Sequence, residues 1–201
     1  MNLVLTVGLV SDTHIPDRVD QLHPHLLDEL RTAGVGHILH AGDISSPAVL
    51  DALASVAPVT AVAGNRDWQF QPALPLCERL ELCGVKIALL HGHGGFTRYV
   101  WDKFLFIKDG YILERYRDLL QRDGKGARVI VFGHTHFSEC REVDGQLWIN
   151  PGSACKGPPV RRTPTYGLLR IDENGEVEGE IRPLKGFTAS GGRWIPVKTI
   201  P

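Results

Sequence analysis

The sequence lacks the features that several protein classes require. Its four cysteines, Cys77, Cys83, Cys140 and Cys155, form no Cys-x-x-Cys pair, which argues for reduced thiols in a cytoplasmic protein and against a thiolate metal site. No apolar run reaches the roughly 18 residues of a membrane helix, so no membrane partner is expected. Charge of one sign is also missing, because 22 Lys and Arg balance 23 Asp and Glu to a net −1. Non-specific nucleic-acid binding is therefore not expected.

The length and the hydrophobic pattern predict an α/β protein with one domain over residues 1–201. Strands are expected at residues 4–10, 37–40, 59–63, 80–83, 85–90, 128–132, 140–149 (two strands around a turn at 144–145), 166–171 and 177–181, and helices at 22–33, 46–56 and 110–121. The first half alternates strand and helix, which favours parallel pairing through right-handed crossovers. The second half contains hairpins, so we expect sheets with mixed pairing.

Aromatic residues gather between positions 96 and 116, where seven of the chain's fifteen lie: Phe96, Tyr99, Trp101, Phe104, Phe106, Tyr111 and Tyr116. One interpretation is a helix that packs these rings into the core. The other is a lid beside the site or a contact between the subunits of a homo-oligomer. The sequence leaves both open.

Metal-binding residue types follow five of the predicted strands. The clusters are Asp12-Thr13-His14, His40-Ala41-Gly42-Asp43, Gly64-Asn65-Arg66-Asp67, His91-Gly92-His93 and Gly133-His134-Thr135-His136. Ligands of open α/β sheets bind outside the carboxyl ends of strands, so the clusters should converge in space. Residues two apart point the same way on an extended chain, so each Asp-x-His or His-x-His pair can serve one site.

Seven of these residues are candidate metal ligands: Asp12, His14, Asp43, Asn65, His91, His134 and His136. A single tetrahedral zinc ion needs only three or four protein ligands. Seven suit two ions that share one carboxylate, and two ions roughly 3.5–4 Å apart acidify a bridging water and hold phosphoryl oxygens for in-line displacement. Such a mixed ligand set accepts manganese, iron, nickel, cobalt or zinc, of which we expect manganese.

The ordered blocks Asp-x-His, Gly-Asp, Gly-Asn-x-Asp, His-Gly-His and Gly-His-Thr-His resemble those of the calcineurin-like metallophosphoesterases, specifically the small bacterial and archaeal phosphodiesterases. With Asn150-Pro151-Gly152-Ser153, the resemblance spans residues 12–153. It implies a four-layer α/β/β/α sandwich and a phosphodiesterase in which a hydroxide bridging two metal ions attacks phosphorus. By position, the resemblance gives one ion Asp12, His14 and His136, the other Asn65, His91 and His134, and makes Asp43 the bridge.

Arg66 is a departure from the family pattern, because many relatives carry His after the asparagine. A guanidinium can clamp phosphate through two hydrogen bonds, but with a pKa above about 12 it is a poor proton donor. His93 is the nearest alternative acid in the sequence. We therefore expect Asn65, Arg66 and His93 to contact a small phosphodiester or nucleotide-like substrate, with Arg66 and His93 as the catalytic groups.

Other polar residues are expected to have structural roles. Asp67 should brace its turn, and His40 should support the core or the ligands. We expect His23, His25 and His37 to be solvated and outside the site. Asn150-Pro151-Gly152-Ser153 either ends a strand or orients a ligand or phosphate.

Two alternatives to an enzyme stay open. A eukaryotic retromer subunit of the same fold is a protein-binding scaffold with a degraded metal centre, so the fold alone does not imply catalysis. Here every ligand position is filled, including His134 and His136, which favours the enzyme over a scaffold. The third possibility is an assembly module that works through residues 96–116 and keeps a vestigial site.

Overall fold

The computed structural model describes residues 3–67, 73–155 and 163–197. The strands are β1 (Leu3–Val10), β2 (His37–His40), β3 (Val59–Ala61), β4 (Cys77–Leu82), β5 (Val85–Leu90), β6 (Val129–Phe132), β7 (Glu139–Val143), β8 (Gln146–Asn150), β9 (Thr165–Asp172), β10 (Val177–Pro183), β11 (Phe187–Ser190) and β12 (Arg193–Pro196). The helices are α1 (Leu26–Thr32), α2 (Pro47–Ala54), α3 (Phe96–Asp109), the 3₁₀ turn η2 (Leu113–Tyr116) and α4 (Arg117–Asp123).

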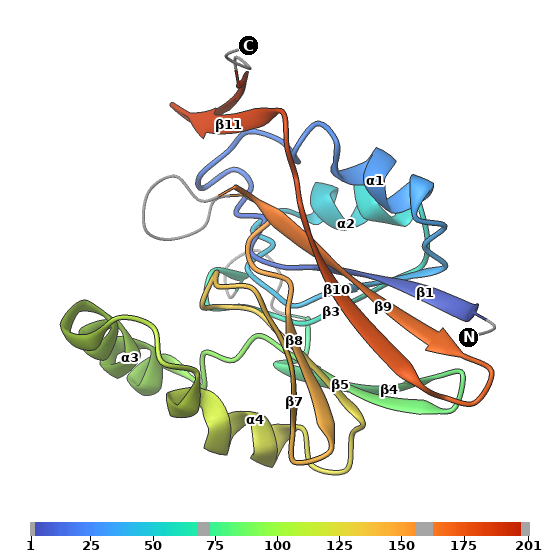
Figure 1. Cartoon of the computed structure of the whole chain (residues 1–201). Helices are drawn as coiled ribbons and strands as arrows, with labels where there is room; N and C mark the ends of the chain where they lie inside the picture. The colour runs from blue at the N-terminus through green and yellow to red at the C-terminus, as the bar shows by residue number, and fades with distance from the viewer. Residues whose placement is uncertain (1–2, 68–72, 156–162, 198–201) are drawn as a thin grey trace.

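Two five-stranded sheets pack face to face between helices (Figure 1). One sheet has the order β10-β9-β1-β2-β3 and the other β4-β5-β6-β8-β7. Both contain parallel and antiparallel pairs. Helices α1 and α2 pack on the outer face of the first sheet, while η2 and α4 pack on the outer face of the second. The predicted α/β class and four-layer sandwich with mixed sheets are confirmed.

Side chains that alternate along the strands fill the three interfaces between the four layers. Val129 and Val131 of β6 face the first sheet, whereas Ile130 and Phe132 face α4. In β1, Gly8 lies under α1, where an added Cβ would come within 2.8 Å of Leu30 Cδ2. The missing side chain therefore lets the helix pack close to the sheet.

Two helices differ from the prediction. The first begins at Leu26 rather than residue 22, because the preceding residues form a turn in which Leu26 N–H donates to His23 C=O (2.9 Å). Pro24 disfavours a helical backbone at His23, which explains the late start. The helix predicted at 110–121 begins later as well, because Gly110 has φ 75° and ends α3. Helix α2 begins as expected, with Ser46 at the cap and Pro47 at the first position.

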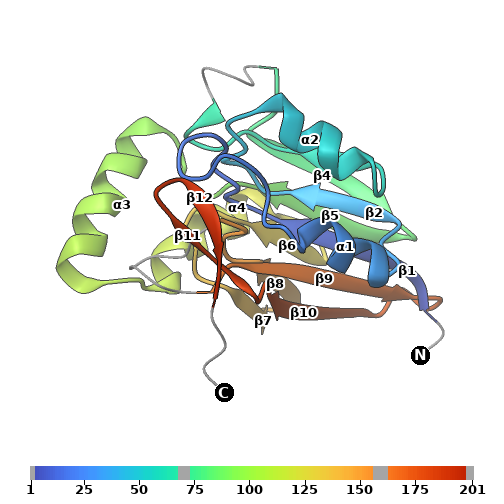
Figure 2. The same cartoon turned by 90° about the horizontal axis from the view of Figure 1, so that it is seen from above.

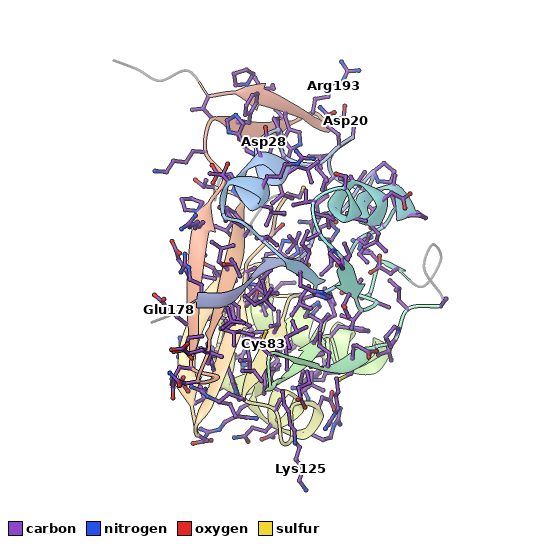
Figure 3. The ribbon with its side chains drawn as sticks, turned by 90° about the vertical axis from the view of Figure 1, so that its right-hand side faces the viewer. Asp20, Asp28, Cys83, Lys125, Glu178 and Arg193 are labelled. Atoms are coloured by element: carbon purple, nitrogen blue, oxygen red, sulfur yellow. The ribbon has the colours of Figure 1, made fainter. Side chains whose placement is uncertain are left out.

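The hairpin β11–β12 was not predicted, and it overturns the expectation for His23. The His23 ring packs edge-on against Trp194 of β12 (ring centroids 4.7 Å apart) and is only 2% exposed rather than solvated. His25 is exposed as expected, and His37 is half-buried. Figure 3 shows Asp20 and Arg193 side by side at this end of the molecule, with Lys125 at the opposite end.

The aromatic segment forms the helix α3, which stands apart from both sheets (Figures 1 and 2). Packing into the core is the wrong interpretation for Trp101 and Phe104, which stack on each other and are 60% and 57% exposed. Ile107, one turn later, is 84% exposed. Tyr116, beyond the helix, is buried in the core as that interpretation requires. The segment is therefore divided between core and surface.

Two expectations about absent features concern the described ranges. None of the helices there is long and apolar enough to cross a membrane. The four cysteines form no disulfide, as their spacing predicted.

Candidate metal centre

The carboxyl ends of six strands meet at one end of the sandwich. Strands β1, β2 and β3 are parallel neighbours in the first sheet, and β5, β6 and β8 are parallel neighbours in the second. The loops that follow carry all seven predicted ligands: Asp12 and His14 after β1, Asp43 after β2, Asn65 after β3, His91 after β5, and His134 and His136 after β6. Backbone hydrogen bonds join these loops, among them Asp12 N–H to Gly42 C=O (3.0 Å).

Asp12, His14 and His136 form a first group. Their ligand atoms lie within 4.8 Å of one another, as a shared metal ion requires. His136 Nε2 is 3.1 Å from Asp12 Oδ1 and 3.1 Å from His14 Nε2. Three donor atoms from two separate loops thus face one point.

Asn65, His91 and His134 form a second group. The Asn65 Oδ1 atom is 3.2 Å from His91 Nε2 and 3.0 Å from His134 Nδ1. Asp43 lies between the groups, with Oδ2 at 3.6 Å from His14 Nε2 and Oδ1 at 3.5 Å from His91 Nε2. Each group therefore has one Asp43 oxygen.

The donor atoms of the second group fit a cation better than they fit one another. His91 Nδ1 lies 2.7 Å from the carbonyl oxygen of Ala41, which can only accept, so this nitrogen carries the hydrogen. In the neutral ring Nε2 is then unprotonated, yet it faces the oxygens of Asn65 and Asp43. Lone pairs that meet in this way are satisfied by a positive ion, and the backbone hydrogen bond fixes the ring for ligation.

The first group shows the same deficit. Asp12 Oδ1 is buried and faces imidazole nitrogens, with His136 Nε2 at 3.1 Å and His14 Nε2 at 3.7 Å, whereas Asp12 Oδ2 accepts from Ser11 Oγ (2.6 Å) and His134 N–H (3.1 Å). A buried carboxylate oxygen is costly unless a donor or a cation neutralises it, and the imidazole nitrogens that surround this one are themselves metal ligands by type. The residues present therefore fit divalent metal ions with mixed nitrogen and oxygen ligands.

The protonation states suit metal binding. Burial would raise the pKa of Asp12, but the charge of His136 and neighbouring histidines holds it well below its usual range. Burial lowers the pKa values of His14 and His134 well below 6.5. Burial also raises the pKa of Asp43 to about 6. At neutral pH the ionised carboxylates and the neutral imidazoles of His14 and His134 are thus in the forms that bind metals.

The ligand loops are not extended, which corrects the simple spacing argument. Asp12, His14, His134 and His136 have positive φ values of 53°, 50°, 68° and 60°. Their side chains consequently do not follow strand alternation, and His134 and His136 join different groups. Non-glycine residues in this region are uncommon and each costs of order 1 kcal/mol or more, and such strain gathers at functional sites.

Asp67 braces the centre, as predicted. Its Oδ1 accepts from the backbone N–H groups of Ile44 (2.9 Å) and Ser45 (2.7 Å), and its Oδ2 accepts from Gly64 N–H (2.7 Å). A Cβ at Gly64 would collide with the backbone and carboxylate of Asp43, so the two loops pack in direct contact. One buried carboxylate therefore fixes the turn of Asp43 against that of Asn65.

Two further residues support the ligand turns. His40 Nδ1 accepts from Gly42 N–H (3.2 Å), and its Nε2 lies 3.2 Å from Thr13 Oγ1, which gives it the supporting role expected. Asn150 Nδ2 donates to Gly133 C=O (2.8 Å) and to Thr135 Oγ1 (3.1 Å). The Asn-Pro-Gly-Ser segment thus holds the turn that carries His134, which favours the orienting interpretation.

The two predicted catalytic side chains lie at different depths. Arg66 is exposed, and its backbone N–H donates to Asp43 Oδ1 (2.8 Å). His93 is half-buried, with its ring centroid 5.4 Å from that of His91 and 6.2 Å from that of His134. Burial lowers the pKa of His93 to about 4, so its ring is neutral at pH 7.

The sequence interpretation missed Arg18, whose guanidinium lies beside the first group. Arg18 Nη1 is 3.4 Å from His136 Nδ1, and Arg18 N–H donates to His14 C=O (2.9 Å). The only signal in the sequence is a cation four residues after a candidate ligand, which is too common to single out. Ser11 was also missed, because its contact with Asp12 depends on side-chain direction alone.

Comparison with known proteins agrees with this geometry. The profile of the calcineurin-like phosphoesterase superfamily domain matches residues 5–174. The chain belongs to this superfamily. Among curated calcineurin-like phosphoesterase relatives, a probable metallophosphoesterase from Methanothermobacter thermautotrophicus is 34% identical over 173 residues, which cover 84% of this chain and 87% of that protein. A second, from Methanocaldococcus jannaschii, is 30% identical over 184 residues, covering 90% and 82%.

Among solved structures, the calcineurin-like fold of this chain is similar to that of Vps29 from Entamoeba histolytica in complex with zinc. The TM-score is 0.66 at 25% identity, and the match covers 90% of this chain and 100% of that one. The same fold is thus found in a vacuolar sorting protein and in probable metallophosphoesterases. The superfamily implies divalent metal ions, and this chain has residues that fit them.

Proposed function

We propose that this protein is a dinuclear, divalent-metal-dependent phosphoesterase, and more narrowly a phosphodiesterase, with its activity in a single domain. The observation that carries the proposal is the position of Asp43 between two ligand groups, with one carboxylate oxygen toward each. A bridging carboxylate is the feature that a two-ion centre requires and a single-ion site does not.

In this proposal each ion has its own ligands. Asp12, His14 and His136 would hold one ion, Asn65, His91 and His134 the other, and Asp43 both. Two divalent ions there would lower the pKa of water and neutralise charge on a phosphoryl group. Manganese is the metal we expect, and the mixed donors also accept iron, nickel, cobalt or zinc. Zinc in the similar Vps29 structure supports a metal in this fold.

Arg66, Asn65 and His93 would bind the phosphate. Arg66 lies next to Asn65, so its guanidinium can donate two hydrogen bonds to non-bridging phosphate oxygens. His93 is neutral at pH 7, so it can donate a hydrogen bond to the leaving oxygen but rarely carries a second proton to give. Departure without full protonation favours activated esters, and a small phosphodiester or nucleotide-like compound is the proposed substrate class.

The test combines metal analysis with turnover. Purified protein would be assayed for bound metal and for hydrolysis of bis-p-nitrophenyl phosphate and p-nitrophenyl phosphate, with and without manganese. We expect two equivalents of metal, manganese-dependent turnover that prefers the diester, and loss of both metal and turnover in Asp43→Ala. Asp28→Ala, which removes an exposed carboxylate on α1, is the control and should behave as the wild type. Metal-independent turnover would overturn the proposal.

A protein-binding scaffold is the alternative, and metal content alone does not separate it from an enzyme, because the Vps29 structure also contains zinc. A protein that binds two metals but hydrolyses neither ester would favour the scaffold.

The exposed face of α3 supports a partner of some kind in either case. Trp101, Phe104 and Ile107 are exposed apolar side chains about one helical turn apart, and the first two stack on each other. We propose that a second copy of this chain covers it, because a helix face can pack on its own symmetry mate about a two-fold axis.

A further inference from the structure

The arginines of this protein divide by what they contact. Those that form ion pairs with carboxylates are Arg31, Arg115, Arg117, Arg122, Arg128, Arg141, Arg170, Arg182 and Arg193. Arg79 and Arg98 donate to backbone carbonyls. Within the described ranges, the guanidinium groups of Arg18 and Arg66 have neither a carboxylate nor a backbone carbonyl as partner, and both residues are exposed. These two also flank the candidate centre, one beside each ligand group.

Arg18 is held close to the first group. Its backbone N–H is bonded to His14 C=O (2.9 Å), and its Nη1 lies 3.4 Å from His136 Nδ1. The opposite nitrogen of the same ring, His136 Nε2, faces Asp12 Oδ1 at 3.1 Å. The guanidinium is therefore one imidazole ring away from the acidic centre, and its charge also contributes to the lowered pKa of His14, after burial.

The contact between Arg18 and His136 cannot persist when His136 holds a metal through Nε2. A guanidinium only donates hydrogen bonds, so the contact needs an unprotonated Nδ1. In a neutral ring the hydrogen is then on Nε2, which lies 3.1 Å from Asp12 Oδ1. Ligation through Nε2 requires a lone pair there and moves the hydrogen to Nδ1. Arg18 then faces an N–H group, loses this acceptor and is available to an anion.

We propose that Arg18 binds a second anionic group of the substrate, next to the phosphoryl group held at the centre. Arg66 and Arg18 would then engage the two ends of one substrate. The inferred substrate class is a phosphate ester that carries a further phosphate or a carboxylate adjacent to the reacting group. The inference rests on the proposed function for the place of the phosphoryl group, but it concerns binding and not turnover.

The experiment compares two ligands that cannot be hydrolysed. Methylphosphonate has one anionic group, and phosphonoacetate adds a carboxylate one carbon away. Calorimetry on the manganese-loaded protein would give both dissociation constants for wild type, Arg18→Gln and Arg18→Lys. The matched control is Arg31→Gln, which changes an exposed arginine that is paired with Asp28 on α1.

We expect wild type to bind phosphonoacetate at least tenfold more tightly than methylphosphonate, as a charge-assisted pair predicts. Arg18→Gln should bind phosphonoacetate about tenfold more weakly than wild type does, with little change in its affinity for methylphosphonate. Arg18→Lys should keep part of the preference for phosphonoacetate, and Arg31→Gln should keep all of it. Because the added carboxylate can also touch metal, the loss in Arg18→Gln is the decisive quantity.

Three results separate this inference from the proposed function. Equal effects of Arg18→Gln on both ligands, or no effect on either, would overturn the role of Arg18 even if ester hydrolysis is normal. Failure to bind either ligand would overturn it as well. If the protein hydrolyses neither ester but still prefers phosphonoacetate through Arg18, the result would support anion binding by Arg18 and would contradict only the proposed catalysis.

Discussion

The metal centre and α3 depart from the usual distribution of residues in opposite directions. At the centre, Asp12, His14 and His91 are at most 1% exposed, although they are charged or polar. On α3, Trp101 and Ile107 are mostly exposed, although they are apolar. Buried polar groups and exposed apolar patches are the two informative exceptions to the normal pattern. Each one predicts something that the chain binds.

The two regions differ in how far other parts of the chain contact their unusual side chains. Loops from six strands brace the centre, and its candidate ligands have partners within the fold except where lone pairs converge, an arrangement that fits a small cation. On α3, the stacked rings of Trp101 and Phe104 are more than half exposed, which makes them candidates for contact with a partner surface. We therefore expect metal binding at the first region and association at the second.

The largest expected effect is the loss of the brace beneath the centre. Asp67→Ala removes the acceptor of three backbone N–H groups in a buried site, which we expect to lower the free energy of unfolding by about 4 kcal/mol. Because these bonds fix the turns of Asp43 and Asn65, metal affinity should fall too. Urea denaturation and metal titration measure the two effects.

Asp51→Ala, at an exposed carboxylate on α2, serves as the control and should change stability by less than about 0.5 kcal/mol. A variant at Asp67 as stable as wild type would mean that the polar centre is not braced as we describe.

Sequence reasoning could place the seven candidate ligands together because their signal is local. Each ligand block follows an apolar run, and parallel strands bring their carboxyl ends together whatever the details of packing. Spacing could not reveal that His134 and His136 enter different groups, because this depends on left-handed backbone at both residues. Arg18 was missed for a similar reason, since its role depends on where a long side chain ends.

The next effect is the stabilisation of the centre by metal. Manganese at one hundred times its dissociation constant should stabilise wild type by about 3 kcal/mol, and a chelator should reverse this. The folded-state pKa of Asp43 is raised to about 6 by burial, so its contribution to stability is present below the unfolded value of 3.8 and is lost as pH rises through 6. Without metal at pH 8, the free energy of unfolding of Asp43→Asn should thus be about 1–3 kcal/mol higher than that of wild type.

Thermal unfolding of both proteins, with and without manganese, at pH 5 and pH 8 measures these terms. With manganese bound, wild type should instead be more stable than Asp43→Asn, because the variant has lost the ligand that we propose both ions share. Equal stability of variant and wild type under all four conditions would show that the buried carboxylate carries no such penalty.

The third effect concerns α3. If a second copy covers its apolar face, Trp101→Glu and Phe104→Glu should each weaken self-association by about 2 kcal/mol or more, with little change in the stability of the monomer. Sedimentation velocity over a range of concentrations measures this. Leu76→Glu, at an exposed apolar residue outside α3, is the control. A wild-type protein that stays monomeric at the highest concentration would exclude the second copy and leave a different partner.

The fate of the aromatic segment could not be read from sequence, because the helical spacing of apolar residues is the same on a covered and an uncovered face. Tyr111 stacks on Phe137 with ring centroids 4.6 Å apart, while Trp101 faces outward. Only tertiary packing separates these two rings. The hairpin β11–β12 escaped prediction for a related reason, since its strands are short and mostly exposed.

The smallest effect comes from His23, which tests whether a buried histidine by itself marks a site. Its ring lies among aromatic side chains, with Trp194 at 4.7 Å and Phe187 at 5.8 Å, and burial followed by the charge of His25 lowers its pKa to about 4. A depressed folded-state pKa means that stability is full above the unfolded value of 6.5 and is lost as pH falls toward 4. Between pH 7 and pH 5.5 the metal-free protein should lose about 1 kcal/mol through this group. In urea denaturation, the free energy of unfolding of His23→Phe should fall by about 1 kcal/mol less than that of wild type between these pH values. His25→Phe, at an exposed neighbour, should keep most of the wild-type loss, because burial is the larger cause of the shift and remains. If His23→Phe keeps the full acid sensitivity, the sensitivity arises elsewhere in the fold.

Burial in apolar surroundings keeps His23 neutral, while the histidines of the centre also face carboxylates. This second condition is what distinguishes a candidate ligand from a core residue.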